Sequence, residues 1–343
     1  MSNKVISFII PSYNSEKCLR GCLESFLCKD QTVEEKIEVV IVNDGSADST
    51  ASIAEDYVQR YPGIFRLINQ ENGGHGQAIN SGTKVACGKY LKVVDSDDWV
   101  KTESLPVFVK KLETCNADVV LTPYQQVNIQ SGEVSDWTMN HVQFDHTYTL
   151  KQVMAQYRDF IRCLVFHSVT YRRDFYQQNR YELPRKVYYE DIEYVTMPCS
   201  RAESFYPIDL CIYEYQVGNE EQSVSAKNRL RKLEDSEKVT LDLVSFYRSC
   251  RRQSPEIREF AGRMAEQMIL SHYVTCCILD PDKKEGRRLF DRYNRKVASL
   301  KSGILSRMKK KVMIFQLMNI MHVSEKQYRR ILNSRLYQLL RKC

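Results

Sequence analysis

The 343-residue sequence lacks any run that approaches the ~18–20 consecutive apolar residues of a membrane-spanning helix. We therefore do not expect an integral membrane protein. The strand-like run 5–10 begins so early that it leaves no room for a signal peptide, so secretion is not expected. The twelve cysteines include no CxxC pair, which favours free thiols in a reducing compartment over disulfides or a zinc site. These absences together predict a cytoplasmic protein.

Acidic residues are almost absent from the end of the chain. Residues 296–343 contain twelve Lys/Arg and one acid, Glu325, whereas the first 295 residues contain 38 Lys/Arg and 42 Asp/Glu. A nucleic-acid-binding protein would be basic more evenly, and no zinc-finger, RNP or basic-zipper pattern occurs. We therefore predict no nucleic-acid partner.

Residues 1–125 alternate strand and helix signals. Short β-branched runs predict strands at 5–10, 37–42, 65–68, 90–94 and 118–121. Helical spacing between them predicts helices at 15–27, 49–60, 103–115, and from the glycine cluster 73–76 to residue 86. This alternation predicts an α/β fold with a mostly parallel sheet and helices on both faces.

The pattern changes after residue 125. Residues 125–150 are rich in polar side chains and predict a long loop or extended insertion, and 151–215 mix short helices and strands. From residue 226 the pattern is nearly all helical, at 226–252, 255–279, 283–300, 303–321 and 324–342. We predict an α/β domain at 1–225, with halves 1–125 and 126–225, followed by a helical, basic region at 226–343.

Three predicted strand ends carry unusual polar sequences, and ligands bind open α/β sheets at the carboxyl ends of strands. The segment Asp95-Ser96-Asp97-Asp98 follows a buried strand with three carboxylates in four residues. Crowded carboxylates repel unless a cation joins them, and Mg²⁺ or Mn²⁺ accepts such ligands together with phosphate oxygens. An acidic turn that caps the next helix is the structural alternative.

The other two strand ends are ambiguous from the residues alone. Asp44 suits an Asx turn before a helix and equally a carboxylate that accepts from the imide N–H of a pyrimidine. Tyr13 could stack on a base or lie in the core. The cluster Asn72–Gly76 has neither the GxGxxG spacing nor a Walker lysine, so no Rossmann or P-loop site is supported. Its glycines would still let a ligand approach the backbone closely, and His75 stays ambiguous.

Taken together, these segments resemble glycosyltransferase family 2, the inverting enzymes of the GT-A fold. Five motifs stand in family order over 5–125: Ile9-Ile10-Pro11-Ser12-Tyr13-Asn14; Val42-Asn43-Asp44-Gly45-Ser46 with Asp48 and Thr50; Asn72-Gly73-Gly74 with Ala78, Asn80 and Gly82; Ala86, Gly88 and Tyr90; and Asp95-Ser96-Asp97-Asp98-Trp99. One residue departs from the pattern, because Ile79 stands where the family often has an arginine.

The resemblance implies a role for each residue. A nucleotide-sugar donor, most often a UDP-sugar, would contact Pro11, Tyr13, Asn14, Asp44, Gly73, Gly74, Asp95 and Ser96. Mn²⁺ or Mg²⁺ would be bound by Asp97, Asp95 and Asp98, with Asp97 as the principal ligand. Asp191 or its neighbour Glu190 would be the general base, although acids at a helix N-terminus are the structural alternative. Residues 222–225 would close over the donor diphosphate.

The predicted function is therefore metal-dependent, inverting transfer of a sugar from a nucleotide-sugar to a hydroxyl of a saccharide or lipid-linked saccharide, in cell-surface polysaccharide or glycolipid synthesis. A nucleotidyltransferase and a catalytically silent nucleotide-sugar-binding module are the alternatives. The helices of 296–343 combine basic and apolar residues. They predict either peripheral contact with the cytoplasmic face of a membrane or a packed subdomain or homodimer interface.

Overall fold

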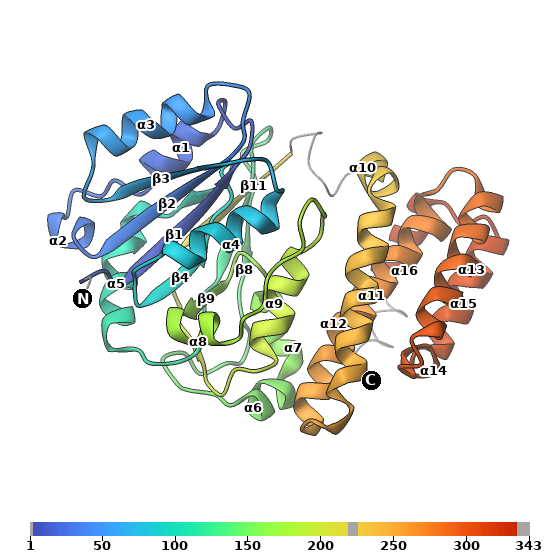
Figure 1. Cartoon of the computed structure of the whole chain (residues 1–343). Helices are drawn as coiled ribbons and strands as arrows, with labels where there is room; N and C mark the ends of the chain where they lie inside the picture. The colour runs from blue at the N-terminus through green and yellow to red at the C-terminus, as the bar shows by residue number, and fades with distance from the viewer. Residues whose placement is uncertain (1–2, 219–225, 335–343) are drawn as a thin grey trace. The chain divides into compact units, whose positions relative to one another are not determined.

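The computed structural model describes residues 3–218 and 226–334 (Figure 1). The chain divides after Asn219 into two compact units. The first is called the sheet unit and the second the helical unit. Each is described by itself.

The sheet unit contains a seven-stranded sheet with the order β10-β6-β9-β4-β1-β2-β3. Only β9 runs antiparallel to its neighbours in this sheet, β4 and β6. The strands are β1 (Ile6–Ser12), β2 (Ile37–Asp44), β3 (Phe65–Gln70), β4 (Tyr90–Val93), β6 (Val119–Leu121), β9 (Val169–Arg172) and β10 (Phe205–Pro207).

Helices cover both faces of this sheet, as the sequence predicts (Figure 1). The helices of the sheet unit are α1 (Leu19–Glu24), α2 (Gln31–Glu34), α3 (Thr50–Arg60), α4 (His75–Val85), α5 (Leu105–Thr114), α6 (Leu150–Ala155), α7 (Tyr157–Phe160), α8 (Arg173–Gln178) and α9 (Asp191–Cys199), with 3₁₀ turns η1 (Thr102–Ser104) and η2 (Ile161–Cys163). The predicted helix 15–27 is helical only over α1.

The apolar runs form central strands because both of their faces are covered. Every residue of β1 and β2 is buried. Phe8 faces the core cluster that also contains Ile53 and Phe108 of α3 and α5. Its neighbour Ile9 points to the other face, where a Cβ added to Gly82 of α4 would lie 2.4 Å from it. Glycine at this position lets α4 pack closely on β1.

The parallel register brings three strand ends to one edge of the sheet. Ser12 of β1 pairs with Asn43 of β2, and Asp44 pairs with Gln70 of β3. The chain leaves β4 at the same edge, toward Asp95. Side chains that are distant in sequence therefore converge there.

A second sheet corrects the interpretation of 125–150 as a loop. Its order is β5-β11-β7-β8, with β5 (Trp99–Val100), β7 (Tyr124–Asn128), β8 (Val134–Trp137) and β11 (Tyr213–Val217). β7 and β8 form an antiparallel hairpin. The hydrophobic pattern missed β8 because three of its four residues are exposed, so no apolar face marks the strand.

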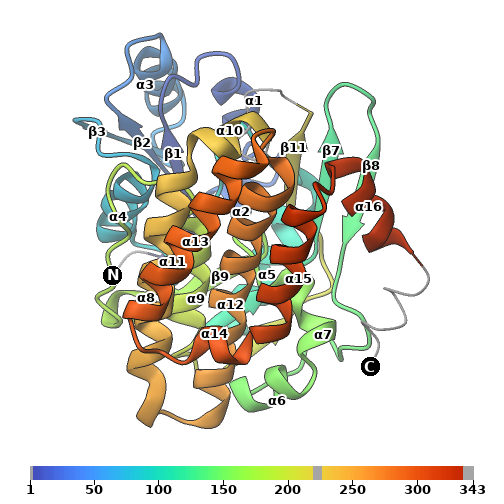
Figure 2. The ribbon, with the colours of Figure 1, turned by 90° about the vertical axis from the view of Figure 1, so that its right-hand side faces the viewer.

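The helical unit has no strand within the residues described, as the sequence predicts. It comprises α10 (Ala226–Arg231), α11 (Leu233–Ser249), η3 (Cys250–Arg252), α12 (Pro255–Tyr273), the π-helical turn η4 (Val274–Leu279), α13 (Lys283–Ser299), α14 (Ile304–Arg307), α15 (Lys309–Ile320) and α16 (Glu325–Asn333). α11 packs along α12, and α13 along α15 (Figure 2). Aromatic contacts among Tyr273, Phe290, Tyr293 and Phe315 form its core.

The sequence predicts neither membrane-spanning helices nor disulfides. None of the helices within 3–218 and 226–334 is long and apolar enough to cross a membrane. Each cysteine in the described part of the chain carries a free thiol.

Candidate active site

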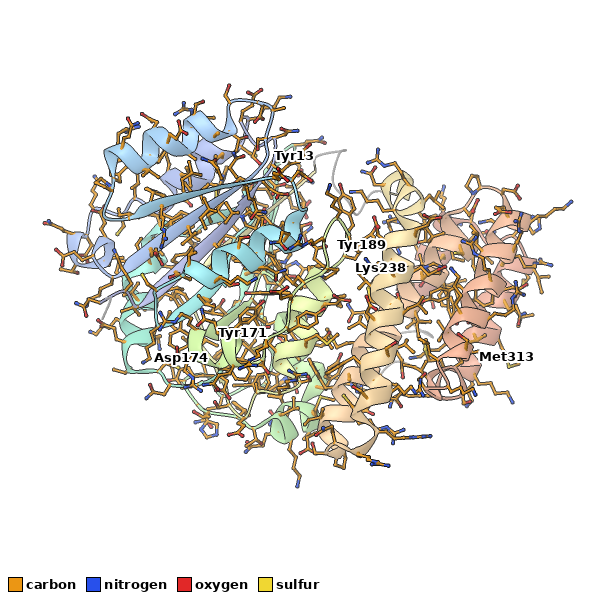
Figure 3. All side chains as sticks on the ribbon, viewed as in Figure 1. Tyr13, Tyr171, Asp174, Tyr189, Lys238 and Met313 are labelled. Atoms are coloured by element: carbon orange, nitrogen blue, oxygen red, sulfur yellow. The ribbon has the colours of Figure 1, made fainter. Side chains whose placement is uncertain are left out.

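A cleft of about 360 Å³ opens where β1 and β2 end. Its walls come from the β1 and β2 ends, the start of α4 and the segment before α9, and are formed by Pro11, Ser12, Tyr13, Asp44, Asn72, Gly74, His75, Ala78, Lys186, Val187 and Tyr188. Tyr13 and the neighbouring segment residue Tyr189 are labelled in Figure 3. A larger hollow of about 790 Å³ beside α2 is wide open and lies away from the strand ends.

Asp44 holds the glycine loop that borders this cleft. Its Oδ1 accepts hydrogen bonds from the Gly73 N–H at 2.8 Å and from Gln70 Nε2 at 2.7 Å. Its Oδ2 accepts from the Gly74 N–H at 2.8 Å. The structure thus brings Asp44, Gly73 and Gly74 together. A carboxylate offers about four acceptor sites, so one remains for a ligand after these three bonds.

Gly74 is held in a conformation that disfavours a side chain. Its φ is +86°, and an added Cβ would lie 2.7 Å from the backbone nitrogen of Lys186. The Lys186 N–H in turn donates to the Gly73 carbonyl at 2.9 Å. The glycine loop is therefore packed directly against the segment that leads to α9.

Gly74→Ala is expected to lower the free energy of unfolding by about 1–3 kcal/mol and to weaken UDP binding, because the loop must move to admit the methyl group. Chemical denaturation and calorimetry with UDP measure the two effects. Gly63→Ala is the matched control, since its Cβ would meet nothing within 4 Å. Equal behaviour of the two variants would show that the loop is not constrained.

His75 joins two acids that lie far apart in the sequence. Its Nε2 lies 2.9 Å from Asp95 Oδ1, and its Nδ1 lies 2.7 Å from Glu190 Oε1. Burial favours the neutral ring, but the charges of Asp95 and Glu190 and their hydrogen bonds outweigh it and hold the pKa of His75 well above its usual value. The protonated ring donates from both nitrogens. It therefore links the end of β4 to the start of α9.

The acids after β4 occupy different environments. Asp98 is 1% exposed and accepts from the Tyr213 hydroxyl at 2.6 Å and the Gln216 N–H at 2.7 Å. Burial and the neighbouring carboxylates raise its pKa well above the usual value. Asp97 is exposed at the surface of the same turn, where loss of hydration and the charge of Asp95 raise its pKa to about 6. Burial disfavours ionisation of Asp95, but His75 lowers its pKa.

His167 completes a possible metal site that the sequence did not indicate. One of its ring nitrogens and carboxylate oxygens of Asp95 and Asp98 all lie within 4.8 Å of one another. Within the described chain, its buried Nδ1 has no hydrogen-bond partner. Burial lowers the pKa of His167 to about 4, so the ring is neutral at pH 7 and can bind a cation. Buried Lys92 donates to its carbonyl at 2.8 Å and fixes the backbone there.

These donors fit a divalent cation. Two carboxylates and a neutral imidazole are suitable ligands for Mn²⁺, and carboxylates suit Mg²⁺. A cation would also relieve the repulsion that raises the pKa of Asp98. The acidic turn can therefore hold a divalent metal, and which ion it binds stays a prediction.

The predicted base region forms the N-terminus of α9. Glu190 is buried, whereas Asp191 keeps access to solvent. Partial loss of hydration and the charge of Glu190 raise the pKa of Asp191 to about 6. Tyr189, just before them, adopts a φ of +73°, which is costly for a bulky residue and is often found at functional sites.

The remaining predicted site residues are placed as follows. Pro11 and Tyr13 line the cleft, and Tyr13 is 54% exposed. Asn14 donates its N–H to Ser46 Oγ and accepts from the Ala47 N–H, which ties the β1 end to the loop after β2. Ser96 is buried and hydrogen-bonds Ser15. The predicted closing segment 222–225 lies outside the described residues.

The α/β sheet carries an acidic strand end with a cleft beside it, and comparison with known proteins identifies the family. The model of "Glycosyl transferase family 2" matches residues 7–180. The chain therefore belongs to glycosyltransferase family 2, and this membership argues against the nucleotidyltransferase alternative.

Similar proteins come from several bacteria. EpsH of Bacillus subtilis is 30% identical over 193 residues, which are 56% of this chain and 54% of EpsH. The poly(ribitol-phosphate) beta-glucosyltransferase of Bacillus spizizenii is 34% identical over 125 residues, or 36% of this chain and 19% of that protein. The chain thus matches about half or less of the length of these relatives.

Solved structures share the fold at low identity. S. aureus TarS 1–349, in complex with UDP-GlcNAc, has a TM-score of 0.61 at 18% identity, over 98% of this chain and 92% of that one. The mannosyltransferase PcManGT from Pyrobaculum calidifontis, in complex with GDP-Man and Mn²⁺, has a TM-score of 0.50 at 16% identity, over 92% and 84%. They support the predicted GT-A fold with a helical C-terminal region.

Proposed function

We propose that this glycosyltransferase transfers a sugar from a UDP-sugar to a hydroxyl of a cell-surface polysaccharide or glycolipid acceptor, with a divalent cation and with inversion. One observation carries the proposal. His75 connects Asp95, at the acidic turn, with Glu190, beside the accessible carboxylate of Asp191. The His75 imidazole thus lies between the candidate metal site at Asp95 and the candidate base at Asp191, next to the cleft.

The cleft suits the nucleotide. The half-exposed ring of Tyr13 offers a face on which uracil can stack, and Pro11 lines the same cleft. The remaining acceptor site of Asp44 suits the N3–H of uracil. Gly74 lines the cleft, and the diphosphate would lie beside the loop that it forms with Gly73.

The other residues would act on the transfer itself. Asp95, Asp98 and His167 would hold the cation, and Asp97, exposed at the same turn, is the further candidate ligand. A bound cation would neutralise the charge that develops on the departing diphosphate. Asp191 would take the proton of the acceptor hydroxyl. Attack by that oxygen from the face opposite the diphosphate inverts the anomeric carbon in one displacement.

The relatives support the choice of donor and acceptor class. TarS binds UDP-GlcNAc and UDP in its solved structures, and a matched relative is named for transfer of glucose to poly(ribitol phosphate). The structure of PcManGT holds Mn²⁺. We propose a UDP-sugar and a cell-surface polymer by analogy with them, and a cytoplasmic location where such donors are available.

Release of UDP from a panel of UDP-sugars tests the proposal. We expect release with Mn²⁺ or Mg²⁺ that rises when a saccharide acceptor is added and stops in excess EDTA. GDP-mannose serves as the donor control. Donor binding with no turnover under any condition would indicate the silent binding module, and full turnover in EDTA would contradict metal dependence.

A further inference from the structure

Helix α15 carries apolar side chains on two opposite faces. Its inner face packs within the helical unit, where Phe315 and Asn319 are buried. Its outer face carries a second apolar set, called the outer stripe: Met313, Ile314, Leu317, Ile320 and the adjoining Met321, which are 48–74% exposed. Their spacing of three and four residues places them on one side of the helix. A surface helix normally has polar residues there.

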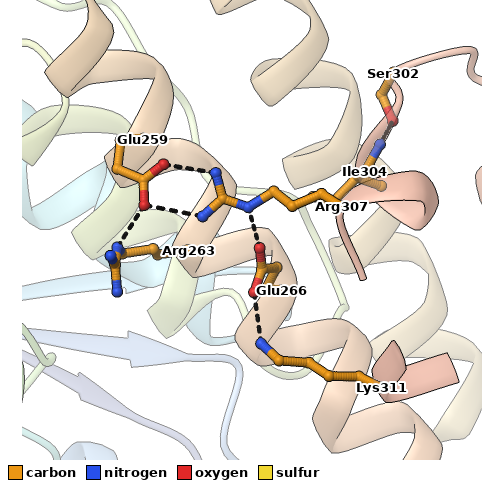
Figure 4. A network of polar contacts seen from close by, with 7 residues as sticks. All are labelled: Glu259, Arg263, Glu266, Ser302, Ile304, Arg307 and Lys311. Carbon is orange, nitrogen blue, oxygen red and sulfur yellow. Dashed lines mark hydrogen bonds and ion pairs between the residues drawn. The ribbon is translucent and has the colours of Figure 1, made fainter. Parts of the chain in front are cut away.

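The basic residues beside α15 fall into two groups. Arg307 and Lys311 form ion pairs with Glu259 and Glu266 of α12, as Figure 4 shows. These contacts tie the end of α14 and the first turn of α15 to α12. They also remove two of the cations that the sequence had offered for membrane contact.

The second group of basic residues forms no described ion pair and could contact a membrane. Lys309 and Lys310 are exposed and have no carboxylate within 4.0 Å in the part of the chain that the structure describes. Lys310 precedes Met313 by three residues and Ile314 by four, so it lies on the side of the outer stripe. Lys326 and Arg330 of α16 are exposed without a described acidic partner as well.

We propose that the outer stripe, together with Lys309 and Lys310, binds the surface of an anionic lipid bilayer. The apolar side chains would enter the acyl boundary while the lysine ammonium groups reach the headgroups. Charge complementarity selects this partner, because Lys309, Lys310, Lys326 and Arg330 are exposed cations without an acidic partner among the described residues. A twofold contact between copies would place this basic segment against itself.

Co-sedimentation of the full chain with vesicles tests the proposal. We expect binding to phosphatidylcholine vesicles that contain phosphatidylglycerol, weaker binding at high salt, and none to phosphatidylcholine alone. Lys309→Gln with Lys310→Gln should lower the partition coefficient roughly thirtyfold. Leu317→Ser with Ile320→Ser should lower it by about tenfold or more.

Matched control variants distinguish binding through the outer stripe from nonspecific binding of the protein to vesicles. Ile129→Ser with Val134→Ser removes apolar side chains that are exposed to the same extent in the sheet unit, at 55% and 51%. Lys29→Gln with Lys110→Gln removes two other exposed lysines. Neither pair should change vesicle binding by more than about twofold. Thermal unfolding checks that each variant folds, and Met313→Ser with Met321→Ser provides a second apolar pair.

Three outcomes would overturn the proposal. The first is an intact chain that stays in the supernatant with anionic vesicles, and the second is binding that the stripe and lysine variants leave unchanged. The third is a dimer, measured by light scattering, that dissociates in the Leu317→Ser, Ile320→Ser variant while vesicles bind nothing. That result would assign the outer stripe to a second copy of the chain.

Discussion

Asp191→Asn is expected to slow sugar transfer roughly 10³-fold while changing the affinity for UDP by no more than about twofold. An amide cannot accept the proton of the acceptor hydroxyl, and the cleft residues that would bind UDP lie on other segments. Initial rates with UDP-sugar and acceptor, and calorimetry with UDP, measure the two quantities. Asp174→Asn, at an exposed acid of α8 labelled in Figure 3, is the matched control and should retain full rate.

The pH profile identifies the base independently. Asp191 accepts a proton only when it is ionised, and its pKa is about 6. The native rate should therefore fall as the pH drops through 6, and this acid limb should be absent from the residual activity of the variant. If Glu190→Gln instead removes the limb and most of the rate, Glu190 is the base. A collapse of UDP affinity in Asp191→Asn would assign Asp191 to the donor site.

Asp95→Asn is expected to lower the rate by roughly 10³-fold and to weaken Mn²⁺ binding, because Asp95 belongs both to the Asp95–Asp98–His167 group and to the contact with His75. Metal titration of the EDTA-treated enzyme measures activation. Calorimetry with Mn²⁺ alone gives a readout that does not depend on turnover.

Asp97→Asn is the informative comparison for this variant. Asp97 stands two residues away on the exposed side of the turn and outside the group of three. We expect a smaller loss of Mn²⁺ affinity for Asp97→Asn than for Asp95→Asn. The reverse order would place the metal on the Asp95-x-Asp97 pair, as the sequence motif alone predicts. Unchanged activity of both variants in EDTA would contradict metal dependence.

Local patterns were sufficient to predict the sheet and the strand ends. The runs at β1 and β2 are mostly apolar on both faces, which favours the centre of a covered sheet. Because parallel strands end at one edge, the sequence also predicted that Tyr13, Asp44 and Asp95 would converge. The helical pattern after residue 226 is local too, and the structure adds the capping residues Ser324 and Asp282 at two helix starts.

Local sequence patterns could not predict the contacts between distant segments. His75 and Glu190 are 115 residues apart, and no spacing rule relates them. No motif surrounds His167 in the sequence, so nothing there predicted its position. The antiparallel strand β9, which follows His167, brings it close to Asp95 and Asp98. The sequence also did not predict that Asp44 supports the glycine loop. The residues around Asp44 fit an Asx turn and a base-binding carboxylate equally well, and neither interpretation includes this contact.

The bonds from Asp44 to Gly73 and Gly74 have a thermodynamic consequence. Glycine is the residue that loses most backbone freedom when a ligand orders a loop. Here that ordering takes place during folding, because a buried carboxylate already fixes both amide groups. The proposed donor would therefore bind a loop with little conformational entropy left to lose. Its affinity would then depend on the contacts of the nucleotide itself, and a small change in those contacts would change the selectivity between donors by nearly its full free energy.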